Sequence, residues 1–333
     1  MTRNKLPSPG LVGAALTLIC TLASVSASAV QSAELYRTQA YFYGRFEARV
    51  QFAPGDGVVS SFFLWKDGSS STTSWNELDF EKIQAACRLQ INIWSGTGTQ
   101  SPQTPSVTGD LCGGYHTYAF EWTPDYIAWF IDGTQLRRET GSVVAEYTQN
   151  ASQGMAIHFN VWVGNASFGG VLDPSILPLY EYIDWVQYSS YANGSFQQQW
   201  REDFDGAGIP AGWAVGDWQS PYGLSTHNPL NVNVVNGVAV LSLTADGATG
   251  YSGVPPVDTD GGSSALPSDA GTAEAASSSG CGCRAAGGRF GGWGQVPVLV
   301  AFAGLLRRRP RRASYRRPPT FSSTSPPGRQ LEG

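Results

Sequence analysis

The sequence is short of basic residues, of cysteine and of helical periodicity. Residues 30–283 contain nine Lys and Arg against 25 Asp and Glu, which gives a formal charge near −16. A protein of that sign repels phosphates, so we expect no nucleic-acid partner and favour a neutral ligand. Of five cysteines, only Cys87 and Cys112 lie between residues 30 and 247.

The first 29 residues have the pattern of a signal peptide. Arg3 and Lys5 precede an apolar run that is short for a membrane span, and Ala27-Ser28-Ala29 follows it. Small residues at that spacing are typical of a signal-peptidase site. We therefore expect an exported protein, extracellular or at the cell surface, whose mature chain begins near Val30.

The C-terminal quarter, residues 248–333, has a different composition from the middle of the chain. Residues 248–280 are rich in Gly, Ser, Ala and Pro and predict a flexible linker. Residues 281–333 contain two cysteines, a short apolar stretch and an arginine cluster. They resemble a sorting or anchor segment that would associate with a membrane. A disordered basic tail is the alternative, and the polar end of the chain fits it better.

Residues 44–244 show the alternation of β-strands and almost no period of 3.6. Turn signals such as Asp132-Gly133 and Asn236-Gly237 separate the apolar runs. Many short strands in one domain predict two packed sheets, so we expect an all-β fold, a jelly-roll β-sandwich over residues 30–247. The clearest predicted strands cover residues 45–52, 58–65, 89–94, 118–122, 126–131, 155–162, 182–188 and 238–244.

Three acids alternate with apolar residues in Glu77-Leu78-Asp79-Phe80-Glu81. On a strand the three carboxylates share one face. A retaining glycosidase needs two carboxyl groups about 5 to 5.5 Å apart, one protonated and one ionised to attack the sugar. Crowding raises the pKa of one acid, which keeps it protonated near neutral pH. An ordinary solvated acidic strand is the alternative.

Aromatic and amide residues on neighbouring predicted strands favour the glycosidase. Flat rings cover the apolar face of a pyranose, and amides bond its hydroxyls. Each ring alone is equally compatible with core packing. These neighbours are Phe63, Trp65, Trp75, Trp94, Trp162, Gln90, Asn92 and Asn160.

The two cysteines of the β-rich part are predicted to pair. If the strand at residues 89–94 opens a hairpin that turns near Thr99, Cys87 and Cys112 face each other at its open end. An exported chain meets oxidising conditions, so a structural disulfide is favoured over a metal or nucleophile role.

Five segments of the chain resemble one known family. They are residues 59–64, 77–81, 115–124, 159–162 and 177–186. The chain is similar to the lichenases, the 1,3-1,4-β-glucanases of glycoside hydrolase family 16. The strand pair that opens most members follows these motifs here, at residues 203–218. The order over residues 33–247 therefore resembles the circularly permuted lichenases.

The resemblance implies a concanavalin A-like sandwich that hydrolyses β-glucan as a monomer. Glu77 would be the nucleophile, Glu81 the general acid and then base, and Asp79 the residue that tunes both. No cofactor is implied for catalysis. The glucan-binding residues implied are Phe63, Trp65, Trp75, Gln90, Asn92, Asn160, Trp162 and Trp218.

The family also binds a structural calcium ion. The matching ligands are the side chain of Asp184 and the backbone carbonyls of Asp203 and Gly237, oxygen donors that suit this hard cation. Alternatively, Asp184 caps a turn.

Some positions depart from the family pattern. Trp65 replaces Tyr, Asp67 replaces Asn, His158 replaces Arg and Phe168 replaces Trp. These departures affect the expected linkage preference and leave the reaction type intact.

Two other functions fit the same sequence. A laminarinase or galactan hydrolase of the same family would commonly carry one more residue, E-x-D-x-x-E, which bulges the strand. A lectin-like sandwich without activity would not need all three acids. The regular spacing and the complete acid set favour the lichenase.

Overall fold

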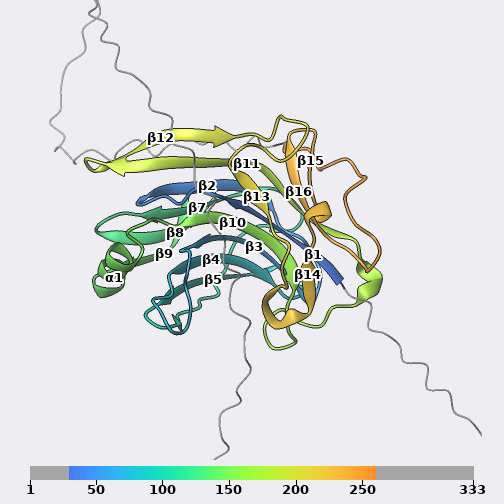
Figure 1. The fold of residues 1–333 in the computed structure, drawn as a ribbon, viewed down its shortest axis with the longest axis horizontal. Coiled ribbons are helices and arrows are strands. Elements are labelled where there is room, and N and C mark those ends of the chain that lie inside the picture. The colour runs from blue at the N-terminus through green and yellow to red at the C-terminus, as the bar shows by residue number, and fades with distance from the viewer. Residues whose placement is uncertain (1–29, 260–333) are drawn as a thin grey trace, which may run out of the picture.

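The computed structural model describes residues 30–259, which form two β-sheets packed face to face (Figure 1). The predicted signal peptide and C-terminal segment lie outside these residues. The predicted all-β jelly-roll sandwich is confirmed.

The first sheet, called here the front sheet, has the strand order β13-β1-β10-β3-β4-β5-β6, and β14 pairs with β1. Its strands are β1 (Val30–Arg37), β3 (Val58–Trp65), β4 (Glu77–Ile83), β5 (Arg88–Ser95), β6 (Thr99–Gln100), β10 (Ala156–Val163), β13 (Trp213–Val215) and β14 (Ser225–His227).

The second sheet, the back sheet, has the order β15-β16-β11-β2-β7-β8-β9, and β12 pairs with β11. Its strands are β2 (Gly44–Gln51), β7 (His116–Trp122), β8 (Tyr126–Ile131), β9 (Thr134–Thr140), β11 (Leu179–Ala192), β12 (Ser195–Glu202), β15 (Val232–Val235) and β16 (Val238–Leu243). All eight strands predicted from sequence are present, with ends shifted by a few residues.

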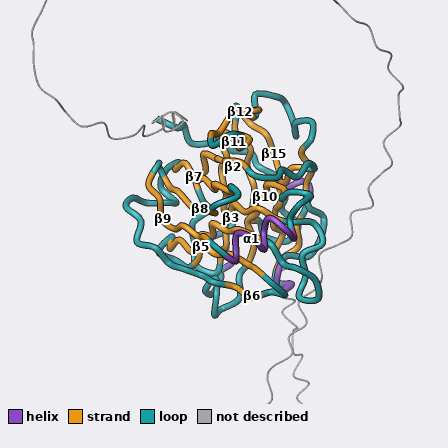
Figure 2. The backbone as a smooth tube through the Cα atoms, turned by 90° about the vertical axis from the view of Figure 1, so that its left-hand side faces the viewer, coloured by secondary structure: helices purple, strands orange, loops and turns teal. Residues whose placement is uncertain are grey.

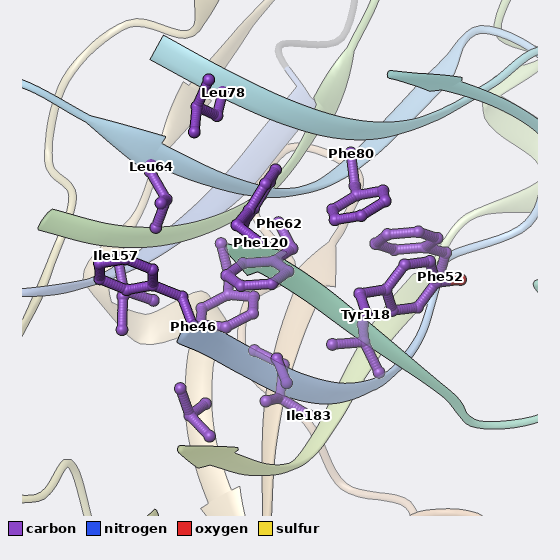
Figure 3. Packing of buried hydrophobic residues seen from close by; sticks show 14 of the residues in the cluster. Phe46, Phe52, Phe62, Leu64, Leu78, Phe80, Tyr118, Phe120, Ile157 and Ile183 are labelled. Atoms are coloured by element: carbon purple, nitrogen blue, oxygen red, sulfur yellow. The ribbon is translucent and has the colours of Figure 1, made fainter. Parts of the chain in front are cut away.

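The core fills the space between the sheets because strand alternation sends one set of side chains inward. Phe62 and Phe80 of the front sheet meet Phe120 of the back sheet, with ring centroids 4.9 and 4.6 Å from that of Phe120 (Figure 3). All three are fully buried. Each such ring contributes about 1.5–3 kcal/mol of burial free energy. The inward residues of β4 therefore hold this strand in place.

A single α-helix, α1 (Ser142–Asn150), is described, and the sequence did not predict it. It lies at one end of the sandwich (Figures 1 and 2). Its buried Tyr147 donates from its hydroxyl toward the carbonyls of Glu77 and Trp94, at 2.8 and 2.7 Å, and accepts from the Glu77 N–H. The helix thereby ties the start of β4 to β5. Three short 3₁₀ turns complete the fold: Pro174–Ile176, Pro221–Gly223 and Pro229–Asn231. No helix among the described residues is long and apolar enough to span a membrane.

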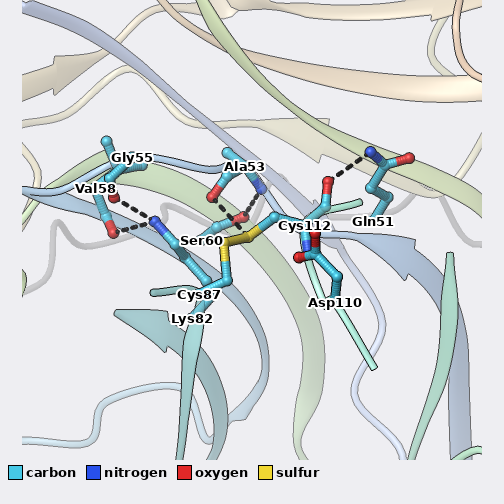
Figure 4. Close-up of a disulfide and its surroundings, with 9 residues drawn as sticks. All are labelled: Gln51, Ala53, Gly55, Val58, Ser60, Lys82, Cys87, Asp110 and Cys112. Atoms are coloured by element: carbon cyan, nitrogen blue, oxygen red, sulfur yellow. Dashed lines mark hydrogen bonds between the residues drawn. A yellow bond between two sulfur atoms is a disulfide. The ribbon is translucent and has the colours of Figure 1, made fainter. Parts of the chain in front are cut away.

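The disulfide predicted for Cys87 and Cys112 is present in the structure, with Cα atoms 6.1 Å apart (Figure 4). Beside it, the buried Lys82 donates to the carbonyls of Gly55 and Val58 at 2.6 and 3.1 Å. Burial lowers the Lys82 pKa to about 7. Both contacts hold the loop before β3 against β4.

The first and the last strand of the domain lie next to each other at Gln31 and Thr244. The N–H of Gln31 donates to the Thr244 carbonyl at 2.9 Å, and the N–H of Thr244 donates back at 2.8 Å. Permutation costs little when termini are adjacent in this way.

The ordered domain extends past the predicted boundary at residue 247. Asp258 accepts two hydrogen bonds from Arg49, both at 2.8 Å, and both side chains are buried. The Tyr115 hydroxyl donates to the Pro256 carbonyl at 3.2 Å. The start of the predicted linker thus packs on the back sheet, because polar contacts replace the apolar burial that its composition lacks.

Candidate active site

The carboxylates of Glu77, Asp79 and Glu81 lie on the face of β4 turned away from the core. Leu78 and Phe80, between them, are fully buried on the other face. Glu77 and Glu81 remain partly exposed, whereas Asp79 is buried. The side chains therefore alternate as predicted, and the two glutamates are largely buried but keep part of their surface accessible to solvent.

Burial raises the pKa of all three acids. The pKa of Glu77 rises to about 7 and that of Glu81 to about 8, where the charge of Glu77 adds to the effect of burial. Burial and the charges of Glu77 and Glu81 raise the pKa of Asp79 well above its usual range. Glu77, Asp79 and Glu81 are called here the carboxylate row. They titrate as a coupled set, so the row retains protons near neutral pH. Glu81, with the higher pKa of the two glutamates, suits the general acid.

Two hydrogen bonds favour the ionised form of Glu77. The Trp75 indole N–H donates to Glu77 Oε2 at 2.6 Å. A protonated Asp79 donates the second, which lowers the pKa of Glu77 and raises that of Asp79. Glu77 is therefore the acid best prepared to attack as a carboxylate.

Strand register places the predicted sugar-binding residues of β3, β5 and β10 on the same face. Trp65 pairs with Glu77, and Phe63 pairs with Asp79. On the other side of β4, Asn92 pairs with Asp79 and Gln90 with Glu81. Asn160 of β10 pairs with Ser61, which itself pairs with Glu81.

The amides are used differently. Gln90 Nε2 donates to Glu81 Oε2 at 3.4 Å. Asn92 Oδ1 accepts from the backbone N–H groups of Ile93 and Ser101, so this oxygen supports the β5 loop. Asn160 Oδ1 is buried and has no partner among the described residues, which leaves it available to a sugar hydroxyl.

Three of the predicted stacking rings gather at the Glu77 end of the carboxylate row. Trp75 stacks on Trp94 at 4.6 Å and meets Trp65 edge-on at 5.8 Å, beside Glu77. Trp218 lies beside β1, three strands from β4, with its ring centroid 5.8 Å from that of Tyr36. Trp162 is only 4% exposed and belongs to a small buried cluster, so it offers little ring surface to a ligand.

Sequence reasoning missed a polar cluster next to the row. Glu34 of β1 contacts His158 Nδ1 at 2.9 Å and His227 Nε2 at 3.3 Å. His158 pairs with Phe63 and stacks on Tyr36 at 5.1 Å. The negative charge of Glu34 raises the pKa of Glu77. Only the pairing of β1 with β10 and β14 brings these residues together, and the local sequence carries no sign of it.

Two of the predicted calcium ligands, Asp203 and Gly237, lie close to each other. A Cβ added to Gly237 would lie 3.8 Å from the Asp203 carbonyl oxygen. Asp184 sits at a bulge between β11 and β2, where burial, Asp258 and Asp203 raise its pKa and Arg201 and Arg49 lower it. Oxygen donors and crowded carboxylates fit a divalent cation. The Asp203 carboxylate itself bonds Arg201 at 2.6 Å, so its carbonyl is the oxygen left for the ion.

Two cavities, of about 340 and 520 Å³, lie around Asp110, one beside residues 256–259 and the other beside the disulfide. No residue of the carboxylate row lines either one. We assign chemistry to the carboxylate row, because within residues 30–259 it alone combines paired acids with raised pKa values and neighbouring rings.

A two-sheet sandwich that presents paired glutamates between aromatic rings and amides defines a glycoside hydrolase of the two-carboxylate class. The match to the model of glycosyl hydrolases family 16 covers residues 11–198. The chain belongs to this family.

Similar proteins include two β-glucanases. That of Fibrobacter succinogenes is 34% identical over 260 residues, 74% of this chain and 72% of that protein. That of Paenibacillus macerans is 32% identical over 162 residues, 47% of this chain and 64% of that protein. Among solved structures, the β-glucanase of Bacillus licheniformis is 27% identical, with a TM-score of 0.41 over 49% of this chain and 78% of that one.

Proposed function

We propose that the protein is an exported, retaining endo-glucanase that cleaves mixed-linkage 1,3-1,4-β-glucan. The observation that carries the proposal is the row of Glu77, Asp79 and Glu81 on the outward face of β4, with pKa values raised. The similar proteins named β-glucanase support a glucan substrate.

The chemistry follows from the two glutamates. Glu77, ionised and held by the Trp75 indole, attacks the anomeric carbon and forms a glycosyl-enzyme bond. Glu81 gives its proton to the leaving oxygen, and the bond to the leaving sugar breaks. Glu81 then takes a proton from water, which attacks the same carbon and releases Glu77. Asp79 holds a proton next to Glu77 and so steadies its charge during each half-reaction.

The linkage assignment rests on the regular strand. Glu77, Asp79 and Glu81 pair in unbroken register with β3 and β5. An extra residue between the acids would bulge the strand, which is the laminarinase pattern. The spacing here therefore supports the mixed-linkage substrate.

Reducing-sugar release from lichenan, laminarin and agarose tests the proposal. Release from lichenan, lost by at least about 10²-fold in Glu77→Gln and Glu81→Gln, is expected. NMR of the first products should show the β-anomer, as retention requires. Activity on laminarin alone would overturn the linkage, and inactivity on all three substrates would favour the lectin.

The remaining expectations become part of the same proposal. The meeting of Gln31 and Thr244, which brings the two ends of the domain together, supports the proposed circular permutation. The sequence of residues 1–29 supports export. We also propose a monomer, with calcium held by Asp184 and the carbonyls of Asp203 and Gly237. The ion would stabilise the junction of these segments and take no part in the reaction. A membrane association through residues 281–333 remains the proposal for that segment.

A further inference from the structure

The front sheet carries a second group of rings beyond the Glu81 end of the carboxylate row. Trp162 pairs with Val59, two residues before Ser61, so it lies one step past Glu81 on the same face. Phe168 stacks on Trp162 at 6.2 Å, and Val59 and Ile83 pack beneath. Trp162 is thereby covered and serves as a support.

The ring exposed at this end belongs to Tyr222. Its centroid lies 6.0 Å from that of Trp162, and the residue is 47% exposed. Tyr222 stands in the 3₁₀ turn Pro221–Gly223, which comes from the C-terminal part of the domain. Neither the local sequence nor the family resemblance pointed to it.

The backbone of Tyr222 is held in a left-handed conformation, with φ 63° and ψ −4°. A bulky residue rarely adopts this conformation, and such strain persists where the surroundings impose it, often at ligand sites. Ser220 fixes the turn by bonding the carbonyl and the hydroxyl of Ser225 at 2.9 and 2.8 Å. The turn therefore presents the ring in one orientation.

Tyr222 also lies within electrostatic reach of the row. Burial raises the pKa of its phenol, and the charge of Glu81 raises it further, while a hydrogen bond with the Asn165 side chain lowers it. The ring thus lies within electrostatic range of Glu81, on the side of the row where Trp162 stands.

We propose that Tyr222 is a sugar-stacking residue that binds a glucose unit of the glucan on the Glu81 side of the cleaved bond. Trp162 and Phe168 form the platform that orients its ring. The inference rests on the proposed function and adds a specificity-determining residue to the same site. A planar ring that is half exposed and immobilised loses little entropy when a pyranose face packs on it.

Tyr222→Gly is the sharpest test, because glycine accepts the left-handed backbone and the fold should survive. We expect KM for lichenan to rise about three- to tenfold, with kcat changed by less than about twofold, because one aromatic contact is lost. Tyr222→Phe, which keeps the ring, should recover most of the affinity. Leu224→Ala, two residues on and equally exposed, is the matched control and should leave KM unchanged.

Calorimetry with a mixed-linkage glucan tetrasaccharide separates this inference from the proposed function. In a Glu77→Gln background, Tyr222→Gly should weaken binding by the same factor. If the wild type hydrolyses no glucan but this loss of binding appears, the enzyme assignment fails and the stacking role stands. An unchanged Kd and KM in Tyr222→Gly, or no binding of the tetrasaccharide to the Glu77→Gln protein, would overturn the inference.

Discussion

Replacing Trp75 with Phe should move the acid limb of the activity profile to higher pH. The indole N–H donates to Glu77 Oε2 at 2.6 Å and lowers the pKa of that carboxyl. A hydrogen bond to a charged group contributes about 1.5–3 kcal/mol, and one pKa unit corresponds to about 1.4 kcal/mol. Removing this donor should raise the Glu77 pKa by about one unit, from about 7 to about 8.

The sign follows from the role of Glu77. The nucleophile must be ionised, so a higher pKa removes activity at low pH. At pH 6 the ionised fraction, and with it kcat/KM, should fall about tenfold beyond any change at the optimum. Because Glu81 titrates at about 8, the two limbs then overlap, and the maximum should drop by about twofold.

The assay is kcat/KM for lichenan between pH 5 and 9. Trp65→Phe is the matched control, because Trp65 contacts Trp75 edge-on at 5.8 Å. This control should lower affinity without moving the acid limb. An acid limb that stays in place in Trp75→Phe would refute the assignment of Glu77 as the group that this indole holds ionised.

Three further changes test the surroundings of the site. Cys87→Ser with Cys112→Ser opens a disulfide that spans 25 residues and should lower the free energy of unfolding by about 3 kcal/mol, measured by urea titration against the oxidised protein. Asp258→Ala leaves the buried Arg49 without its bidentate partner and should cost about 2 kcal/mol or more in the same titration, whereas a chain ending at residue 259 should match the full chain. Calcium at 100 times its Kd should stabilise the protein by about 2.7 kcal/mol, and Asp184→Asn should abolish this gain while activity at 25 °C persists; equal melting temperatures with calcium and with chelator would contradict the site.

The sequence predicts the features that alternation encodes. Eight strands and the common face of Glu77, Asp79 and Glu81 follow from a period of two, because apolar burial on one face sets the register. The rings and amides near these acids were predicted from the same pattern. The disulfide was also predictable, because a hairpin brings its two cysteines together.

Contacts between distant segments were not predictable in the same way. The cluster of Glu34, His158 and His227 depends on three strands that are remote in sequence. Tyr222 reaches the site only through a strained turn. Arg49 and Asp258, which form an ion pair, are 209 residues apart in sequence, and Asp258 belongs to a segment whose composition resembles a linker. The exposure of Trp162 was not predictable either, because Phe168 and other neighbours cover this tryptophan on the outward face of the sheet.

Strand β4 has one face in the core and one face in the active site, and this limits which sequence changes the enzyme can accept. Side chains on the strand can be substituted one at a time, because each lies on only one of the two faces. Its length cannot change in the same way. One residue inserted after Leu78 would point Glu81 into the hydrophobic core and Phe80 toward solvent, unless a β-bulge accommodated the extra residue. Diversification of this sheet should therefore proceed through substitutions along β4 and through insertions in the loops that flank it.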